Sequence, residues 1–129
     1  MLGMQLFLSK SFEIGEHHGL NFIEGKNILI KSSSKKFKIP HIDWENLNIN
    51  EAVVDKNHFL NNVNNKSFYF VHSYMAKLEN KNNIIAYCNY ADLQIPAIIM
   101  THNIIGFQFH PEKSGVNGLK TLDFSLKNL

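Results

Sequence analysis

The segment Gly106–Glu112 places a histidine and a carboxylate two residues apart, directly after an apolar run. In an extended chain, residues i and i+2 project to the same side, so His110 and Glu112 are expected to lie side by side. Pro111 between them excludes a helix at this point. A carboxylate beside an imidazole fixes its tautomer and stabilises the imidazolium, which suits a general base with its orienting group. The other interpretation is a solvated surface turn, and these three residues alone favour that one.

A nucleophile to accompany this pair is hard to find. Cys88, the single cysteine, lies inside the strand-like run IIAYCNY, where we expect it to be a small buried hydrophobe. Ser73 and Ser114 lack the strained strand-to-helix turn that exposes a nucleophile. The segment Leu2–Leu6 begins a helix at once, as the residues after such a turn do. Met1 then stands where the nucleophile would stand.

Composition indicates one ordinary globular domain over residues 1–129, with 44% hydrophobic and 19% charged residues. The net charge of +2 selects no partner, and the one tight basic cluster, at Lys35, Lys36 and Lys38, is interpreted as a solvated turn. A nucleic-acid partner would need a broader basic face with interleaved aromatic residues, so we expect none. The single cysteine excludes an internal disulfide and a multi-cysteine zinc site, and it fits a reducing cytosol.

No stretch approaches 18 uninterrupted apolar residues, and the N-terminus lacks the pattern of a signal peptide. We therefore expect a cytoplasmic protein with no membrane partner. The histidines have no HxH or HExxH spacing, so we expect no metal and no cofactor. An unrelated small domain that uses its histidines for a metal is the weakest of the alternatives.

The elements that must position the His110–Glu112 pair follow from periodicity. We expect helices over residues 2–12 and 114–127, the second capped by Ser114, and a helical turn over 58–63. Strands are expected at 27–31, 67–75, 84–90, 95–101 and 104–109, with 38–44 as an edge strand or extended loop. The runs 95–101 and 104–109 form a hairpin that turns at 102–103. Consecutive short strands favour antiparallel pairing, so the pattern alone predicts an α+β fold.

Five segments together resemble a known family. Met1–Gln5 resembles the end of the elbow G-x-C-L-G-M-Q with methionine in place of cysteine, and Gly106–Ser114 resembles the His/Glu motif of the triad-type, or class I, glutamine amidotransferases. Ile39–Trp44 is similar to V-P-H-x-G-W and Tyr69–Tyr74 to Y-F-V-H-S-Y, both from the amidotransferase subunit of imidazole glycerol phosphate synthase. Gly19–Gly25 also fits in order and spacing. The matches run from the first residue to the last helix.

The resemblance implies an α/β fold in place of α+β: the C-terminal portion of a flavodoxin-like sheet, with the N-terminal strands before the elbow absent. It implies that His110 is the general base and acid and that Glu112 orients it. The family's cysteine attacks the glutamine side-chain amide to give a thioester and ammonia. Because Met1 stands in the cysteine position, we expect the chain as given to be inactive.

The resemblance also implies a substrate site and partners. Gln5 and Glu13 match positions that help to hold glutamine, Ser73 and Tyr74 match a segment that lines the same pocket, and the backbone N–H of Leu2 matches an oxyanion-hole donor. The ammonia would pass to a cyclase subunit with a (β/α)₈ barrel, in a heterodimer that builds the imidazole ring of histidine.

Two residues depart from the family pattern in the segment that faces the synthase partner. Asp43 replaces the usual glycine and Glu45 the usual asparagine. Two alternatives stay open beside the histidine pathway. These two departures leave open a paralogue that supplies ammonia for amidination of bacterial surface sugars. The missing cysteine leaves open a non-catalytic remnant that keeps only a partner-binding surface.

Overall fold

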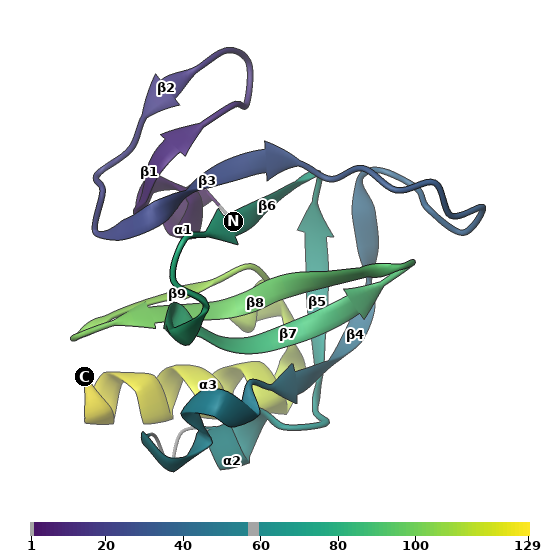
Figure 1. Ribbon diagram of the computed structural model, residues 1–129. Helices are drawn as coiled ribbons and strands as arrows, with labels where there is room; N and C mark the ends of the chain where they lie inside the picture. Colours follow the sequence, from purple (N-terminus) through teal and green to yellow (C-terminus); the bar gives the residue numbers. More distant parts are fainter. Residues whose placement is uncertain (1, 57–59) are drawn as a thin grey trace.

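The computed structural model of the chain describes residues 2–56 and 60–129, which form an α/β fold with two β-sheets, one mixed and one antiparallel (Figure 1). The first sheet has the order β2-β1-β3-β6 and contains the parallel pair β1–β3. The second has the order β5-β4-β7-β8-β9 and is antiparallel throughout. Helix α3, yellow in Figure 1, runs along the second sheet. Among the described residues, no helix is long and apolar enough to cross a membrane.

The element bounds are as follows. The strands of the first sheet are β1 Leu8–Ser11, β2 His17–His18, β3 Ile23–Leu29 and β6 Tyr74–Leu78. Those of the second are β4 His41–Ile49, β5 Ser67–His72, β7 Ile84–Tyr90, β8 Leu93–Thr101 and β9 Ile104–Phe107. The α-helices are α1 Leu2–Leu6, α2 Leu60–Val63 and α3 Gly115–Asn128, and the 3₁₀ turns are η1 Glu51–Lys56, η2 Lys81–Asn83 and η3 Pro111–Lys113.

The chain passes from one sheet to the other at Ser73. The alternation in β5 buries Phe68, Phe70 and His72 on one face, as the period of two predicts. We expected one continuous strand over 67–75, and this expectation is wrong. β5 ends at His72, and β6 joins the first sheet, where the Ser73 carbonyl accepts a hydrogen bond from Ile30 N at 2.9 Å.

The core of the second sheet is mostly aliphatic and contains three buried phenylalanines. Phe68, Phe70 and Phe109 are fully buried, and the Phe68 and Phe109 rings lie 4.3 Å apart between centroids. Burying each such ring contributes about 2–3 kcal/mol. Because Phe109 directly precedes His110, this packing anchors the segment that carries the candidate base.

One further expectation is wrong, and another holds in part. The helix predicted over 2–12 ends at Leu6, and Leu8–Ser11 pairs as a strand with β3, since the Phe7 carbonyl accepts hydrogen bonds from Phe22 N and Ile23 N. We expected the segment 38–44 to be an edge strand or extended loop. Residues 38–40 lie in no strand, and 41–44 pair with β5 alone, whereas β4 pairs with β7 only further on, over 47–49. Pro40 precedes the strand, so its missing N–H removes no ladder bond.

Other expectations are confirmed. β7 spans 84–90, and β8 and β9 form the antiparallel hairpin that turns at 102–103. The strand expected at 27–31 overlaps β3, which begins earlier, at Ile23. The helical turn expected over 58–63 overlaps α2 at 60–63, while 57–59 lie outside the described residues. The C-terminal helix is present as α3.

Candidate functional site

The His110–Glu112 pair forms as the spacing predicts. Nδ1 of His110 lies 2.7 Å from a carboxylate oxygen of Glu112. The His110 backbone N–H donates to the Tyr69 carbonyl at 2.9 Å, so β5 holds the segment in place after β9 has ended. Pro111 then begins the 3₁₀ turn η3. The predicted side-by-side arrangement of the two side chains is confirmed.

The electrostatics of the pair suit proton transfer. The hydrogen bond from His110 holds the pKa of the Glu112 carboxyl below its ordinary value, which favours the carboxylate. A carboxylate bonded at Nδ1 fixes that nitrogen as the donor and leaves Nε2 to accept or give a proton. The His110 side chain is 18% exposed, so the ring is largely covered but still within reach of a reactant.

Ser114 and α3 hold the turn that carries this pair. Ser114 occupies the N-cap position of α3, as expected, but its hydroxyl makes no cap bond. It donates instead to the His110 carbonyl at 2.6 Å and accepts from the Tyr69 N–H at 2.9 Å. Gly118 allows α3 to approach closely, because a Cβ at this position would lie 1.9 Å from the Pro111 carbonyl oxygen.

A separate pocket of about 340 Å³ opens where the chain passes between the sheets. It is lined by Leu2, Gln5, Glu13, Val71, His72, Ser73 and Tyr74. The five residues that the family resemblance assigned to glutamine binding come from α1, the β1–β2 turn and the β5–β6 junction. The structure brings all five to this one pocket.

Helix α1 lies between the pocket and the strand that leads to His110. Leu2 and Gln5 line the pocket, and Met4 packs on Gly106 of β9. A Cβ at Gly106 would lie 2.7 Å from Met4 Cγ, so this glycine permits the close approach. Met1 lies outside the described residues, and the expectation that it is near His110 stays a prediction.

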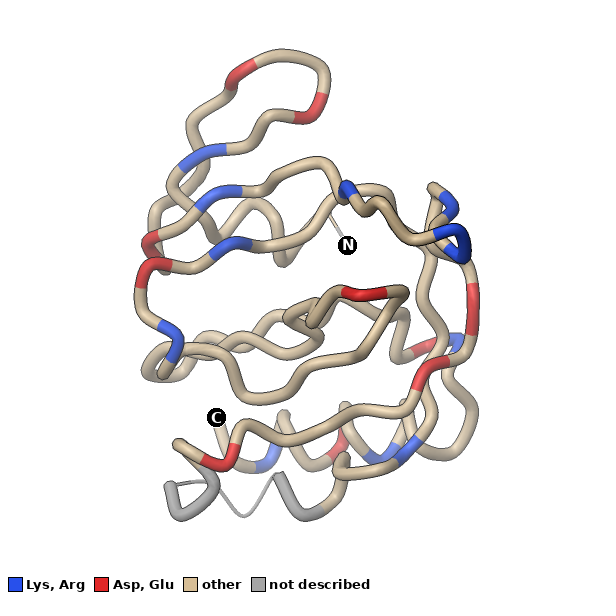
Figure 2. The backbone as a smooth tube through the Cα atoms, turned by 45° about the vertical axis from the view of Figure 1, so that its right-hand side comes forward, with Lys and Arg blue, Asp and Glu red and all other residues tan. Residues whose placement is uncertain are grey.

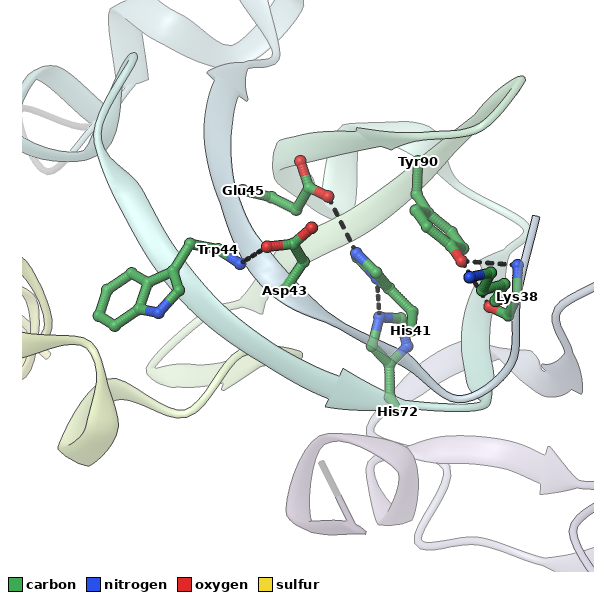
Figure 3. A network of polar contacts seen from close by, with 7 residues as sticks. All are labelled: Lys38, His41, Asp43, Trp44, Glu45, His72 and Tyr90. Atoms are coloured by element: carbon green, nitrogen blue, oxygen red, sulfur yellow. Dashed lines mark hydrogen bonds and ion pairs between the residues drawn. The ribbon is translucent and has the colours of Figure 1, made fainter. Parts of the chain in front are cut away.

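Sequence reasoning missed two contributors to the pocket wall, Val71 and His72. His72 is buried and bonds to His41, whose other ring nitrogen contacts Glu45 (Figure 3). The alternation in β5 was the available signal, because it places a histidine where Phe68 and Phe70 point inward, and a buried polar ring needs a partner.

Cys88 is fully buried, and burial raises the pKa of its thiol, so it is no substitute nucleophile. Within residues 2–56 and 60–129, no group of three or more His, Cys, Asp or Glu side chains is arranged to hold a metal ion. His41 and His72 are instead hydrogen-bonded to each other.

Comparison with known proteins identifies relatives along nearly the whole chain. The family model described as glutamine amidotransferase class-I matches residues 2–126. The chain is 43% identical to imidazole glycerol phosphate synthase subunit HisH of Lactococcus lactis over 128 residues, which cover 99% of this chain and 60% of that protein. The corresponding subunit of Carboxydothermus hydrogenoformans is 43% identical over 122 residues, which cover 94% of this chain and 57% of that protein. Subunit HisH 1 of Methanococcus maripaludis is 44% identical over 122 residues, which cover 95% of this chain and 57% of that protein. The chain thus spans about 60% of the length of these relatives.

Proposed function

Because the chain belongs to the class-I glutamine amidotransferases, we propose that it is part of the glutaminase subunit of an imidazole glycerol phosphate synthase, which hydrolyses glutamine to supply ammonia for histidine biosynthesis. In this proposal, residues 1–129 correspond to the C-terminal portion of a flavodoxin-like fold. The relatives that match nearly the whole chain carry the name of that synthase subunit.

The observation that carries the proposal is the pocket of about 340 Å³. Its lining offers groups that suit the zwitterion of glutamine, namely the Glu13 carboxylate for the α-ammonium and the Gln5 amide for hydrogen bonds. The Ser73 hydroxyl adds a further donor and acceptor. These residue types converge from three separate segments, which favours a binding site over a chance depression.

The His110–Glu112 geometry supports the proposed catalytic roles. His110 acts as general base toward the nucleophile and then as general acid toward the leaving ammonia, while Glu112 orients the ring and stabilises the imidazolium. The backbone N–H of Leu2, at the start of α1, stabilises the oxyanion of the tetrahedral intermediate. The chemistry needs a thiolate to form the thioester, and position 1 of this chain is methionine.

We further propose that the product ammonia passes to a cyclase subunit with a (β/α)₈ barrel, as a heterodimer in the cytoplasm. Support comes from the outer surface of β4 and β5. Ile42 and Trp44 are about half exposed on β4, and the Trp44 ring lies 5.7 Å from that of Tyr69 on β5. Exposed aromatic residues of this kind are enriched in protein interfaces.

Glutamine binding tests the proposal without requiring turnover. Titration calorimetry on the 129-residue chain is expected to give saturable binding of L-glutamine and much weaker binding of D-glutamine. Replacing Glu13 by Gln removes the partner of the α-ammonium and is expected to weaken binding about fivefold or more.

The matched control is Glu24→Gln, an exposed carboxylate on β3 that does not line this pocket. The glutamine dissociation constant of the control should equal that of the unmodified chain. Equal affinities in all three proteins, or no binding at all, would contradict the proposed function.

A further inference from the structure

Three side chains form one chain of hydrogen bonds from the outer part of β4 to the wall of the pocket (Figure 3). A Glu45 carboxylate oxygen lies 3.1 Å from His41 Nε2, and His41 Nδ1 lies 2.8 Å from His72 Nε2. His72 Nδ1 in turn lies 2.8 Å from the carbonyl oxygen of Tyr74. The rings of His41 and His72 are almost completely buried, whereas the Glu45 side chain is 24% exposed.

Strand pairing and stacking fix the two rings. His41 and His72 are register partners on β4 and β5. The His41 ring stacks on Tyr90 of β7 with centroids 3.8 Å apart and an interplanar angle of 17°. The Tyr90 hydroxyl donates to the Lys38 carbonyl and accepts from the Lys38 N–H. With its ring plane held in this way, His41 has little freedom to exchange one partner for another.

The innermost bond spans the junction between the sheets. It joins the ring of His72 to the carbonyl two residues later, across Ser73, where the chain leaves one sheet and enters the other. His72, Ser73 and Tyr74 all line the pocket. The ring therefore braces the backbone that forms this wall.

In this row of hydrogen bonds, the contact between Glu45 and His41 lacks a proton when both rings are neutral. A carbonyl oxygen only accepts, so His72 Nδ1 must carry a proton. Burial lowers the pKa of both rings, that of His72 to about 4, which leaves one proton on each. His72 Nε2 is then an acceptor, His41 Nδ1–H is its donor, and His41 Nε2 is left bare. That bare nitrogen faces a carboxylate oxygen of Glu45, which also has only lone pairs.

We infer that His72 and His41 are positioning residues for the pocket, and that Glu45 completes their hydrogen-bond chain only when one proton is taken up between its carboxylate and His41 Nε2. The inference rests on the proposed function in so far as the pocket holds glutamine. With this proton in place, all three bonds are made. Without it, the Glu45 contact is repulsive, and the partly exposed carboxylate turns to solvent.

Other ionisable groups near the rings do not replace Glu45. The Asp43 carboxylate on β4 accepts the Trp44 N–H at 2.8 Å, and its charge favours protonated His41 only through space. On β7, the thiol of Cys88 has its pKa raised by burial and then by Glu45, so it stays protonated. Among the described residues, Glu45 is the carboxylate in hydrogen-bond contact with either ring.

The contact between Glu45 and His41 depends on pH. Rising pH removes the shared proton and opens the Glu45 contact, while the bonds from His41 to His72 and from His72 to Tyr74 persist. Falling pH closes the contact. Near pH 4, where His72 takes a second proton, its Nε2–H meets His41 Nδ1–H and the inner bond breaks.

Nitrogen NMR of ¹⁵N-histidine-labelled, unmodified chain tests the proton count directly. The expected result is the Nδ1–H tautomer for both His41 and His72, with the shift of His41 Nε2 and the Glu45 carboxyl carbon changing together with pH. An Nε2–H tautomer for His72, or independent titration of His41 and Glu45, would overturn the inference. This readout does not depend on glutamine binding, so it stands even if the proposed function fails.

Glu45→Gln gives the functional test, because an amide N–H donates to His41 Nε2 without any added proton. Because burial lowers the pKa of His41 from its ordinary value of 6.5, the glutamine affinity of the unmodified chain is expected to fall about two- to fivefold as pH rises from about 5 to 7, whereas that of the variant stays flat. Asp43→Asn is the control. It should keep the pH dependence, with a midpoint at slightly lower pH, because it removes a charge that favours protonated His41 without touching the hydrogen bond. The same pH dependence in Glu45→Gln and the unmodified chain would refute the role of Glu45.

Two substitutions of His72 separate positioning from simple stability. The amide of asparagine takes the place of ring Nδ1, so His72→Asn keeps the bond to Tyr74, whereas His72→Gln reaches toward His41 and loses it. Glutamine affinity is expected to stay within about threefold in His72→Asn and to drop about tenfold in His72→Gln. Equal losses in the two variants at equal melting temperature would show that His72 positions nothing.

Discussion

At the scale of single residues, the His110–Glu112 pair could be predicted because its chemistry depends on residues two positions apart. An extended chain and one proline suffice to place the two side chains together, and they lie at 2.7 Å. The His41–His72 pair could not be predicted in this way. Its members are 31 residues apart and meet only through the register of β4 and β5, which no local pattern specifies.

The Glu112 carboxyl is expected to affect how the free energy of unfolding depends on pH in the acid range. Its pKa in the folded protein is lowered by the hydrogen bond from His110, and in the unfolded chain it returns to about 4.3. The folded state therefore binds fewer protons, and the stabilisation is present above about pH 4.3 and lost as pH falls through the lower folded-state pKa. We expect Glu112→Gln to flatten the dependence of unfolding free energy on pH in this window. Urea titrations at several pH values measure it.

The control for this measurement is Glu79→Gln, which removes an exposed carboxylate in the turn after β6. Because the Glu112 side chain is 55% exposed, solvent screens the interaction and the effect will be small. A pH profile of Glu112→Gln that overlays the unmodified protein would show that the pair contributes nothing to stability.

At the scale of elements, two helical glycines differ in whether a side chain would fit. A side chain at Gly118 would collide with the backbone of Pro111, whereas a Cβ at Gly3 in α1 meets nothing within 4 Å. Alanine normally stabilises a helix by up to about 1 kcal/mol relative to glycine. We therefore expect opposite signs, with Gly3→Ala neutral or stabilising and Gly118→Ala destabilising by about 2 kcal/mol or more. Thermal melts decide this, and a stabilising Gly118→Ala would refute the packing of α3 on η3.

A row of lysines crosses the first sheet. Lys10, Lys26 and Lys77 are cross-strand neighbours on β1, β3 and β6, and they appear as blue bands on adjacent strands in Figure 2. Like charges directly opposite each other destabilise a sheet. Lys26→Gln removes both repulsions and is expected to raise stability by about 0.5 kcal/mol at low salt, with the gain shrinking in high salt. Lys66→Gln, in the turn before β5, serves as control, and a salt-independent effect would contradict the electrostatic explanation.

The elements themselves were predictable where one face is clearly apolar, as in β7, the β8–β9 hairpin and α3. The prediction of a helix over 2–12 is wrong for Leu8–Ser11. This segment becomes a strand by pairing with Ile23–Leu29, which lies too far along the sequence to affect a prediction from local periodicity. The run 67–75 carries uniform strand propensity, so the sequence contains no sign that it divides at Ser73. That division forms the pocket wall, and the site thus depends on the feature that local propensity hides.

At the scale of the whole molecule, one helix connects the two halves of the proposed site. α1 contributes Leu2 and Gln5 to the pocket and packs Met4 on the strand that leads to His110. In a glutaminase, a nucleophile at the start of such a helix attacks a substrate bound on one side while the base assists from the other. In the proposed function, the position of this nucleophile corresponds to residue 1, which is methionine here and lies outside the described residues.

The 129-residue chain is therefore expected to bind glutamine and not to hydrolyse it. A thioether has no proton to lose and cannot carry the acyl group stably, and His110 with Glu112 activates a nucleophile but does not replace one. Removing the nucleophile from a comparable triad costs on the order of 10⁶ in kcat. The measurement is ammonia release from glutamine by the purified chain, alone and with a cyclase subunit, with the complete Lactococcus lactis subunit and its cyclase as positive control. Turnover above that of a His110→Ala variant would contradict the prediction and require another nucleophile, for which buried Cys88 is unsuited.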